Sequence, residues 1–322
     1  MLTLFKKYKQ YRNYGFSFHQ CCSRKYRALK DKVYYKVFSY LSNGDYSVEE
    51  AIHSAWIYRK IEKECRISTI DKNTLNNQWK SNEMPKMIWW CWLQGEDKIP
   101  ELPSICLNSL KEKIPDYKIN IVTLDNLSEY VELPRIIYTK FKAGWISGAN
   151  FSDIIRLALL AKYGGIWIDS TVYCTDNKMI KTIENNNMFM YQNLMSSNSN
   201  IIKMSSWLMA TKKGNPFFKE ASRLLNNYYV SANYTEDYYV CHLILTFLLT
   251  QKYSKIWNEM DIFNNTDPHM LQFRLNDQFS LDVWNRILMK ASFHKLNRHL
   301  SMKKSNTFYN YIKNGEVLCE ER

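Results

Sequence analysis

The sequence predicts an α/β protein with a largely parallel sheet. Three short apolar runs, at residues 87–93, 118–124 and 166–168, have the length and composition of strands. Two segments with apolar residues at helical spacing, at residues 102–113 and 151–163, lie between these runs. Because strands and helices alternate along the chain, we expect a sheet built mainly from parallel strands.

The first two expected strands have different signals. The run at residues 87–93 is apolar and aromatic, and it is followed directly by Gln94 and Gly95. Such a run favours a buried strand that ends in a turn. Residues 118–124 alternate between polar and apolar side chains, which is typical of a second strand.

The third expected strand leads to the first candidate functional residue. The helix expected at residues 151–163 ends at Gly164 and Gly165, which together are a good helix terminator. The strand at 166–168 then ends on Asp169. Ligands of open α/β sheets bind beyond the carboxyl ends of the strands. We therefore expect the chemistry of this protein near Asp169.

The first 80 residues predict a basic, mostly helical appendage. Basic and aromatic residues are interleaved through residues 2–40, and a turn signal at residues 43–45 interrupts this pattern. A second helix is expected to start with a sequence that resembles a capping box at Ser47 and to run to about Cys65. The main domain is expected at residues 84–300, followed by a C-terminal tail at residues 301–322.

Positive charge is concentrated in residues 1–40. They hold ten Lys and Arg residues against one acidic residue, Asp31, and the whole chain has a net charge of +13. Such a segment can adhere to an anionic membrane as an interfacial arm, and it can equally form a helical hairpin packed on the main domain. We expect no specific nucleic-acid partner, because no helix-turn-helix, zinc-finger or RNP-like motif accompanies the charge.

The cysteines and the hydropathy indicate a compartment. The eight cysteines include no C-x-x-C pair, which disfavours a zinc ribbon or a redox motif. Several lie in apolar runs, as buried free thiols do, and this favours a reducing compartment. No run of about 18 apolar residues is long enough to cross a bilayer. We therefore expect a cytoplasmic protein that is peripheral at the inner face of the cell membrane.

Asp153 and Arg156 are candidate functional residues on the helix that precedes Asp169. They are three residues apart and therefore share one helix face. An Asp and an Arg held together at a helix start can brace a loop, or they can grip a ligand that carries hydroxyls and phosphates. Such a pair, taken alone, is more often a structural ion pair.

The sequence Asp169-Ser170-Thr171 suggests a cation site at the strand end. In an extended segment, the side chains of residues 169 and 171 point to the same side. A carboxylate and a hydroxyl there can hold Mn²⁺ or Mg²⁺, which are hard cations that prefer oxygen ligands and bridge phosphates.

Together these motifs resemble a known family. Ser152, Asp153 and Arg156, followed by the run from Tyr163 to Thr171, resemble glycosyltransferase family 32, particularly its capsular polysaccharide synthesis branch. The likeness covers roughly residues 84–300, and its motifs occur in the expected order. The other matching motifs are Pro85–Gly95, Ser205–Met209, Asp237–Tyr239 and Phe293–Leu296.

The resemblance implies a GT-A fold, in which a single Rossmann-like α/β domain binds a nucleotide sugar. It also implies transfer with retention of anomeric configuration and a divalent metal. A UDP-sugar is the expected donor, with a GDP-sugar as the second choice, and a glycan or lipid-linked oligosaccharide is the expected acceptor. Asp169 matches the first carboxylate of the family's D-x-D motif. Thr171 stands where the second Asp would be, which weakens the metal site.

The resemblance further implies roles for single residues. Asp153 and Arg156 would grip the sugar hydroxyls and the diphosphate. Arg156, Lys295 and a metal would stabilise the departing diphosphate. Asp237 would orient an acceptor hydroxyl, although the N-terminus of a surface helix explains it equally well. The other implied ligand-binding residues are Trp90, Trp92 and Gln94 near the nucleotide base, Asp169, Ser170 and Thr171 at the metal and donor, and His294 in the metal shell.

These observations favour a hexosyltransferase that builds a capsular or other surface polysaccharide. The alternative is a non-catalytic sugar-nucleotide-binding or scaffold subunit of a polysaccharide assembly complex. Among the histidines, His242 is expected in the core because it lies in an apolar helical run, and His269 is a loop candidate for acceptor contact. His53 and His299 carry no functional signal.

Overall fold

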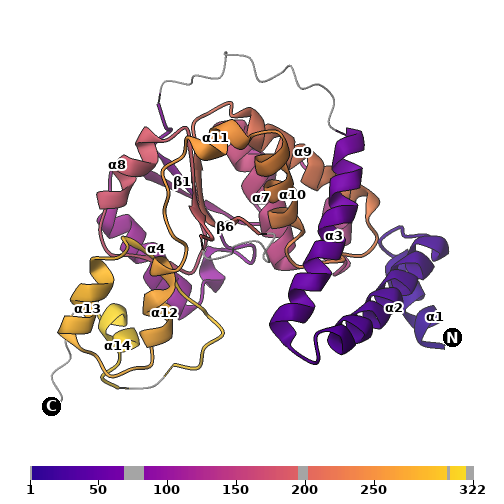
Figure 1. Ribbon diagram of the computed structural model, residues 1–322, viewed down its shortest axis with the longest axis horizontal. Coiled ribbons are helices and arrows are strands. Elements are labelled where there is room, and N and C mark those ends of the chain that lie inside the picture. The colour runs from indigo at the N-terminus through magenta and orange to yellow at the C-terminus, as the bar shows by residue number, and fades with distance from the viewer. Residues whose placement is uncertain (1, 69–82, 195–201, 303–304, 317–322) are drawn as a thin grey trace.

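The computed structural model describes residues 2–68, 83–194, 202–302 and 305–316 (Figure 1). A five-stranded mixed sheet forms its centre, in the order β2-β1-β3-β6-β5. β1 pairs in parallel with β2 and β3, whereas β6 pairs antiparallel with β3 and β5. The strands of this sheet are β1 (Met87–Cys91), β2 (Lys118–Val122), β3 (Gly165–Ile168), β5 (Met188–Gln192) and β6 (Met204–Thr211).

The α/β prediction is confirmed, and the three strands expected from the sequence form the parallel half of the sheet. The sheet is less parallel than predicted, because β6 runs against β3 and β5 runs against β6. Both strands are buried over their whole length. Since both faces are covered, neither strand alternates between polar and apolar residues, and the sequence holds no signal for their direction.

Neighbouring side chains of a strand enter opposite halves of the core. In β1, Trp89 and Cys91 join one cluster, whereas Ile88 and Trp90 join the other, as strand alternation requires. Helices α7, α9 and α10 cover the first face, and α4 and α8 cover the second. These helices are α4 (Glu101–Lys113), α7 (Gly148–Tyr163), α8 (Lys178–Asn185), α9 (Pro216–Ser231) and α10 (Val240–Gln251).

The turn from α7 into β3 requires both of its glycines. Gly164 has a φ of +70° and Gly165 a φ of +86°, a region that residues with a Cβ rarely adopt. A Cβ on Gly164 would lie 2.8 Å from the carbonyl oxygen of Thr211. A Cβ on Gly165 would lie 2.7 Å from the carbonyl oxygen of Met87. This close approach seats β3 between β1 and β6 and fixes where Asp169 emerges.

The C-terminal residues build a further cluster beside the sheet. β4 (Val172–Cys174) pairs antiparallel with β7 (Phe293–Lys295). Phe308, Tyr309 and Ile312 are buried in a cluster that also contains residues of α4. The boundary expected at residue 300 therefore leaves out α14, a helix that is packed into the domain. The remaining elements are α5 (Leu127–Tyr130), α6 (Arg135–Lys142), α11 (Ser254–Asn258), α12 (Met270–Arg274), α13 (Leu281–Leu288), α14 (Phe308–Lys313), η2 (Glu96–Lys98) and η3 (Asp267–His269).

Helix α3 (Tyr46–Ser68) belongs to the main core rather than to a separate appendage. It packs along α10 (Figure 1), and Ile57 and Ile61 are buried in the cluster that covers the first face of the sheet. The Asp45 carboxylate accepts the backbone N–H of Ser47 (2.9 Å) at the start of the helix. Asp45 is therefore the capping residue, where the sequence suggested a capping box at Ser47.

Helices α1 (Leu2–Arg12) and α2 (Phe18–Leu41) form the outer part of the N-terminal region (Figure 1). Phe16, between them, stacks on Trp145 with ring centroids 3.8 Å apart. Arg24 of α2 donates a hydrogen bond to the carbonyl oxygen of Asn233 (3.0 Å). One face of this region is thus packed on the main domain, as the hairpin alternative predicts. None of the helices in the described ranges is long and apolar enough to cross a membrane.

Candidate active site

Asp169 lies at the end of β3, between a buried arginine and a pocket. Its Oδ1 accepts hydrogen bonds from Arg156 Nη2 (2.7 Å) and Trp167 Nε1 (2.9 Å), and its Oδ2 accepts one from Lys295 Nζ (3.1 Å). The backbone N–H of Asp169 donates to the carbonyl oxygen of Trp207 (2.8 Å). Groups from α7, β3, β6 and β7 therefore hold this carboxylate and its main chain in place.

Arg156 joins two carboxylates and is buried behind them. Its Nη1 donates to Asp153 Oδ1 (2.7 Å), on the helix face that the sequence predicts. The guanidinium also lies over the ring of Trp167, 4.9 Å from the centroid. Arg156 is only 4% exposed, and neither it nor Asp153 lines the pocket in front of Asp169. The structure therefore supports the bracing alternative, and it does not place this pair against donor hydroxyls or a diphosphate.

Lys295 connects β7 to the turn that follows β3. Its ammonium donates to Thr171 Oγ1 (2.7 Å) as well as to Asp169 Oδ2, and Lys295 lines the pocket. Asp169, Ser170 and Thr171 form a turn rather than an extended segment, because the N–H of Val172 donates to the Asp169 carbonyl oxygen (3.1 Å). The carboxylate and the hydroxyl still converge, as the sequence predicts, but through this turn and on the ammonium of Lys295.

Two acidic and two basic side chains balance one another in this cluster. Burial opposes ionisation of Asp169, but Lys295 and Arg156 outweigh it and hold the pKa of this carboxyl below its usual value. Burial raises the pKa of Asp153 to about 6, against the opposing effect of Arg156. Asp169 is therefore the ionised carboxylate that meets the pocket.

A pocket of about 610 Å³ opens in front of Asp169 and Lys295. Its walls come from α3, the end of β3, the β5–β6 pair, the start of α10 and the residues before α12. Aromatic rings lie among hydroxyl, amide and imidazole groups, a composition that suits sugars, which have apolar faces and polar edges. The other lining residues are Ser47, Glu50, Ala51 and Ser54, then Asn193, Ile202, Met204, Ser205, Ser206 and Trp207, then Tyr238, Tyr239 and His242, and finally Asn265 and His269.

A series of hydrogen bonds orients one wall of the pocket. Trp207 Nε1 donates to Asn265 Oδ1 (2.8 Å), and Asn265 Nδ2 donates to Asn193 Oδ1 (2.9 Å). His269 Nδ1 lies 2.7 Å from the carbonyl oxygen of Asn265. His269 lies at the end of η3 rather than in a loop and lines the pocket, and its contact with an acceptor stays a prediction. Asn193 and Asn265 belong to no recognisable motif. They are 72 residues apart in the sequence and meet only in the folded chain, so sequence reasoning could not find them.

His242 does not have the environment that its sequence suggests. It lies in the first turn of α10 and lines the pocket, so it is not a satisfied core histidine. Its Nδ1 is buried and has no hydrogen-bond partner among the described residues. Burial lowers the pKa of His242 to about 4, so the ring is neutral at pH 7. The apolar residues around His242 are buried, whereas His242 itself is only partly buried and lines the pocket.

The structure separates His294 from Asp169. His294 is fully buried in β7, directly before Lys295, and consecutive residues of a strand face opposite sides. Its Nε2 lies 3.2 Å from Thr175 Oγ1, on the side away from the pocket. The structure therefore does not support His294 as a ligand of a cation held by Asp169.

The residues expected near the nucleotide base are divided between the core and the surface. Trp90 is fully buried in β1, so its ring packs in the core and cannot stack on a base. Trp92 is half-buried after β1, and its Nε1 donates to the carbonyl oxygen of Lys98 (3.0 Å). The guanidinium of Arg298 lies 5.8 Å from the Trp92 ring centroid. Gln94 is exposed in the following loop, and base contacts of Trp92 and Gln94 stay predictions.

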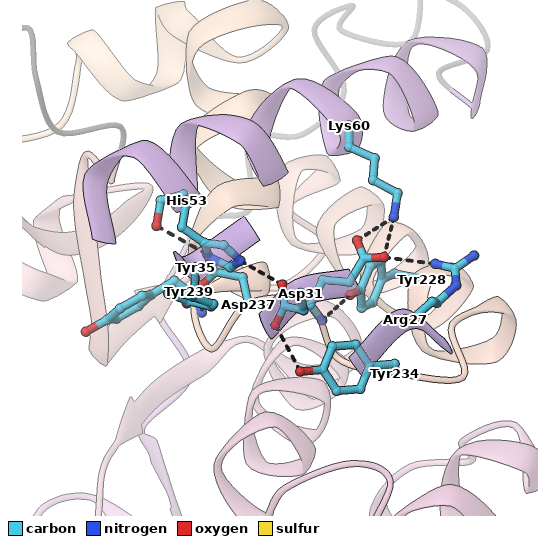
Figure 2. A network of polar contacts seen from close by, with 11 residues as sticks. Arg27, Asp31, Tyr35, His53, Lys60, Tyr228, Tyr234, Asp237 and Tyr239 are labelled. Carbon is cyan, nitrogen blue, oxygen red and sulfur yellow. Dashed lines mark hydrogen bonds and ion pairs between the residues drawn. The ribbon is translucent and has the colours of Figure 1, made fainter. Parts of the chain in front are cut away.

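Asp237 is buried in a polar network that joins α2 and α3 to the residues before α10 (Figure 2). Its Oδ2 lies 3.1 Å from His53 Nδ1 and accepts a hydrogen bond from Ser54 Oγ (3.2 Å). Its Oδ1 accepts the backbone N–H of Tyr239 (2.7 Å), at the start of α10. Both oxygens are thus engaged within the protein. The structure favours the helix-start explanation of Asp237 over the orientation of an acceptor hydroxyl.

His53 is a residue that sequence reasoning missed. It is 2% exposed, and its Nε2 lies 3.1 Å from Asp31 Oδ1 (Figure 2). Burial lowers the pKa of His53, but the hydrogen bonds and charges of Asp237 and Asp31 outweigh it and raise the pKa to about 9. The two carboxylates are 184 and 22 residues away in the sequence, so no local pattern announces the network.

The residues at Asp169 fit a divalent cation that arrives together with a diphosphate. Within the described ranges, no group of three His, Cys, Asp or Glu side chains could hold a metal by itself. In nucleotide sites, however, Mg²⁺ is commonly held by one or two carboxylates together with phosphate oxygens. Asp169 Oδ2 and Thr171 Oγ1 both bind one cationic group, the ammonium of Lys295. They are therefore close enough to share a cation.

The fold and the site define the class of this protein: an α/β domain that presents a balanced acid–base cluster to a pocket suited to sugars. The chain belongs to the family of capsular polysaccharide synthesis proteins, which matches residues 39–312. The matched range includes the sheet, all of α3 and all but the last residue of α14. The mixed sheet, covered by helices on both faces, also agrees with the α/β class that the sequence predicts.

Two further similarities concern parts of the chain. An O-glycosyltransferase, braB, from Annulohypoxylon truncatum is 26% identical over 148 residues, which cover 42% of this chain and 35% of that protein. The match thus spans about a third of the length of that relative. A solved structure, the PaToxG glycosyltransferase, is 15% identical, covers 64% of this chain and 83% of its own, and has a TM-score of 0.41.

Proposed function

We propose that this chain transfers a hexose from a nucleotide-sugar donor to a growing capsular or other surface polysaccharide. The observation that carries the proposal is the pairing of Asp169 with Lys295 at a sugar-compatible pocket in a member of this family. A UDP-sugar is the preferred donor and a GDP-sugar the second choice. The acceptor is a glycan or a lipid-linked oligosaccharide.

The chemistry needs a positive group where the diphosphate leaves. Transfer breaks the bond between the anomeric carbon and a diphosphate oxygen, and it forms a bond from that carbon to an acceptor oxygen. The leaving diphosphate oxygen keeps the electron pair of the broken bond and so gains negative charge, and it takes up the proton that the acceptor hydroxyl loses. The ammonium of Lys295 is the cationic group that lines the pocket beside Asp169, so it would stabilise this charge electrostatically.

Asp169 would act on the donor through its charge and its fixed position. Arg156 and Trp167 hold Oδ1, so the Oδ2 edge is the one that faces Lys295 and the pocket. A divalent cation bound by Asp169 and Thr171 would neutralise further diphosphate charge. We propose retention of anomeric configuration, as the family resemblance implies.

The pocket also offers groups that suit a second sugar. Trp207 and Tyr238 line it with aromatic side chains, and Asn193 and Asn265 line it with amide groups. Sugar rings stack on aromatic faces while their hydroxyls bond to amides. We propose that these residues bind the acceptor.

A donor screen tests the proposal. Purified protein with Mn²⁺ is mixed with single UDP- and GDP-sugars, and the released nucleoside diphosphate is measured with and without a chelator. We expect Lys295→Ala to lower the release from the preferred donor by about 10²-fold or more, the cost of losing one group that stabilises transition-state charge. Lys290→Ala, which removes an exposed lysine close in sequence, is the matched control and should keep full activity.

Two other results would contradict parts of this proposal, the first catalysis itself and the second the role of Lys295. A thermal shift with one sugar nucleotide, but no diphosphate release, would favour the non-catalytic binding or scaffold alternative. Equal activity of Lys295→Ala and Lys290→Ala would show that Lys295 does not stabilise the leaving group.

A further inference from the structure

Helix α2 turns an apolar face to the outside. Tyr26, Leu29, Val33, Val37 and Tyr40, here called the apolar stripe, have exposed fractions of 66%, 53%, 59%, 47% and 85%. Their spacings of three and four residues place them on one side of the helix. Single exposed apolar side chains are normal on protein surfaces, but a continuous row along one helix marks an interaction surface.

The opposite face of α2 fixes this orientation. Asp31 accepts a hydrogen bond from Tyr234 Oη (3.0 Å), as Figure 2 shows. Arg27 pairs with Glu236 (2.9 Å). Cys21 and Phe38 are buried beneath the same face. Contacts with the main domain therefore hold α2 with its apolar stripe outward, so the exposure does not arise from a loosely attached helix.

Lysines border the apolar stripe on both sides. At 100° per residue, Lys25, Lys32 and Lys36 lie along one edge of the stripe, and Lys30 lies along the other. All four are exposed, and none forms an ion pair with another described residue. An apolar band flanked by lysines is the pattern of a helix that lies in the headgroup region of an anionic bilayer.

A second copy of this chain is a poorer partner for the stripe. The stripe spans about 21 Å along a single helix, at 1.5 Å per residue. A stable protein interface buries about 800 Å² on each partner, which is more than one row of side chains offers. Pairing two stripes would also bring their rows of lysines close together, and like charges repel.

We propose that α2 binds an anionic membrane surface through the apolar stripe and its lysines, and so presents the pocket to lipid-linked acceptors. The last residue of the stripe is Tyr40, and the pocket wall begins at Ser47, just beyond the turn that joins α2 to α3 (Figure 1). Membrane binding by α2 does not depend on the proposed function, whereas the presentation of the pocket to lipid-linked acceptors rests on it.

Vesicle co-sedimentation of the full chain tests the docking. Vesicles of phosphatidylcholine alone are compared with vesicles that contain about 30% phosphatidylglycerol, at low and high salt. We expect binding only to the anionic vesicles, weakened by salt. The triple variant Leu29→Ser, Val33→Ser, Val37→Ser should lose binding by about tenfold or more. The triple variant Lys25→Gln, Lys32→Gln, Lys36→Gln should lose the preference for anionic lipid.

The matched control replaces equally exposed apolar residues elsewhere. Ile262→Ser, Phe273→Ser and Met289→Ser together change side chains that are 68%, 71% and 77% exposed, and they should leave vesicle binding unchanged. Equal binding by the stripe variant and the wild type would overturn the proposal, and so would no binding of the wild type to anionic vesicles. A wild-type dimer in light scattering that becomes a monomer in the stripe variant, without vesicle binding, would assign the stripe to self-association instead.

Donor hydrolysis separates the two proposals. The stripe variant should release nucleoside diphosphate from a soluble donor at the wild-type rate, because its three substitutions lie outside the pocket. Loss of vesicle binding with normal hydrolysis would then concern docking alone. Absence of hydrolysis in all forms, with intact vesicle binding, would instead count against the proposed transferase activity.

Discussion

Ion pairs between neighbouring side chains hold the charged residues of the site in place. Arg156 bonds two carboxylates, Asp153 and Asp169, and Lys295 bonds Asp169 from the other side. Removing one partner of such a buried ion pair leaves an uncompensated charge. The resulting loss of stability is larger than the net stability that the pair contributes. The same principle governs His53, which lies between Asp31 and Asp237 away from the pocket.

The charge on His53 makes stability depend on pH. Its pKa is raised from 6.5 to about 9 in the folded protein, so its contribution is fully present below pH 6.5 and is lost as the pH rises through 9. We expect the free energy of unfolding to fall by up to about 3 kcal/mol from this residue over that range. Urea unfolding at several pH values measures it.

The comparison that isolates His53 uses two variants. His53→Gln should be less stable than the wild type at pH 6 and should show a flatter pH profile up to pH 9. His299→Gln, at an exposed position, should follow the wild-type profile. A His53→Gln profile parallel to that of the wild type would mean that His53 does not carry the charge.

Among the elements, the junction of α7 and β3 is the most constrained. It must reverse direction within two residues while β3 enters between two neighbours, and this delivers Asp169 to the pocket. The sequence predicts this turn correctly from its two glycines. Glycine is required at this turn for two reasons, the positive φ angle and the lack of space for a Cβ atom. These two causes can be separated experimentally.

Gly164→Ala and Gly144→Ala separate them. Both glycines have a φ of +70°, but a Cβ on Gly164 would lie 2.8 Å from backbone atoms, whereas nothing lies within 4 Å of one on Gly144. We expect Gly144→Ala to cost about 1 kcal/mol of stability from the backbone angle alone, and Gly164→Ala to cost clearly more. Thermal or urea unfolding of the two variants decides this. Equal losses would show that the neighbouring chain can move away.

The whole molecule has two ends joined by the sheet. Helices α1 and α2 lie at one end, and α12, α13 and α14 lie at the other (Figure 1). The two ends differ in how they meet the sheet domain. Helix α3 enters the main core directly, whereas α2 contacts the domain through polar groups and a small separate cluster around Trp145, and leaves its apolar stripe outside.

Truncation of the full chain should reveal this difference. A chain that starts at residue 45 keeps α3 and should stay folded, with a lower melting temperature because His53 loses Asp31. A chain that starts at residue 83 loses the buried Ile57 and Ile61, each worth about 2 kcal/mol or more, and uncovers α10. We expect it to be poorly soluble. If both truncated chains melted at the same temperature, α3 would not belong to the core.

The fold could be predicted in part because its signals are local. The aromatic run that forms β1, the alternation in β2 and the glycine pair before β3 each carry their own pattern. The antiparallel direction of β5 and β6 could not be predicted, because strands buried on both faces look alike whichever way they run. The extent of the domain was missed at both ends, since the short helix α14 and the amphipathic helix α3 show their partners only once folded.

The sequence by itself determined that an α/β sheet ends on Asp169, that Asp153 and Arg156 share a helix face, and that positive charge gathers at the N-terminus. Only the tertiary structure decided that Arg156 braces Asp169 from behind, that His294 faces away while Lys295 faces the pocket, and that His53 joins Asp31 to Asp237. The physical reason is the distance along the chain over which each interaction acts. Helix and strand periodicity act over a few residues, whereas burial and the pairing of charges depend on segments that meet only in the folded chain.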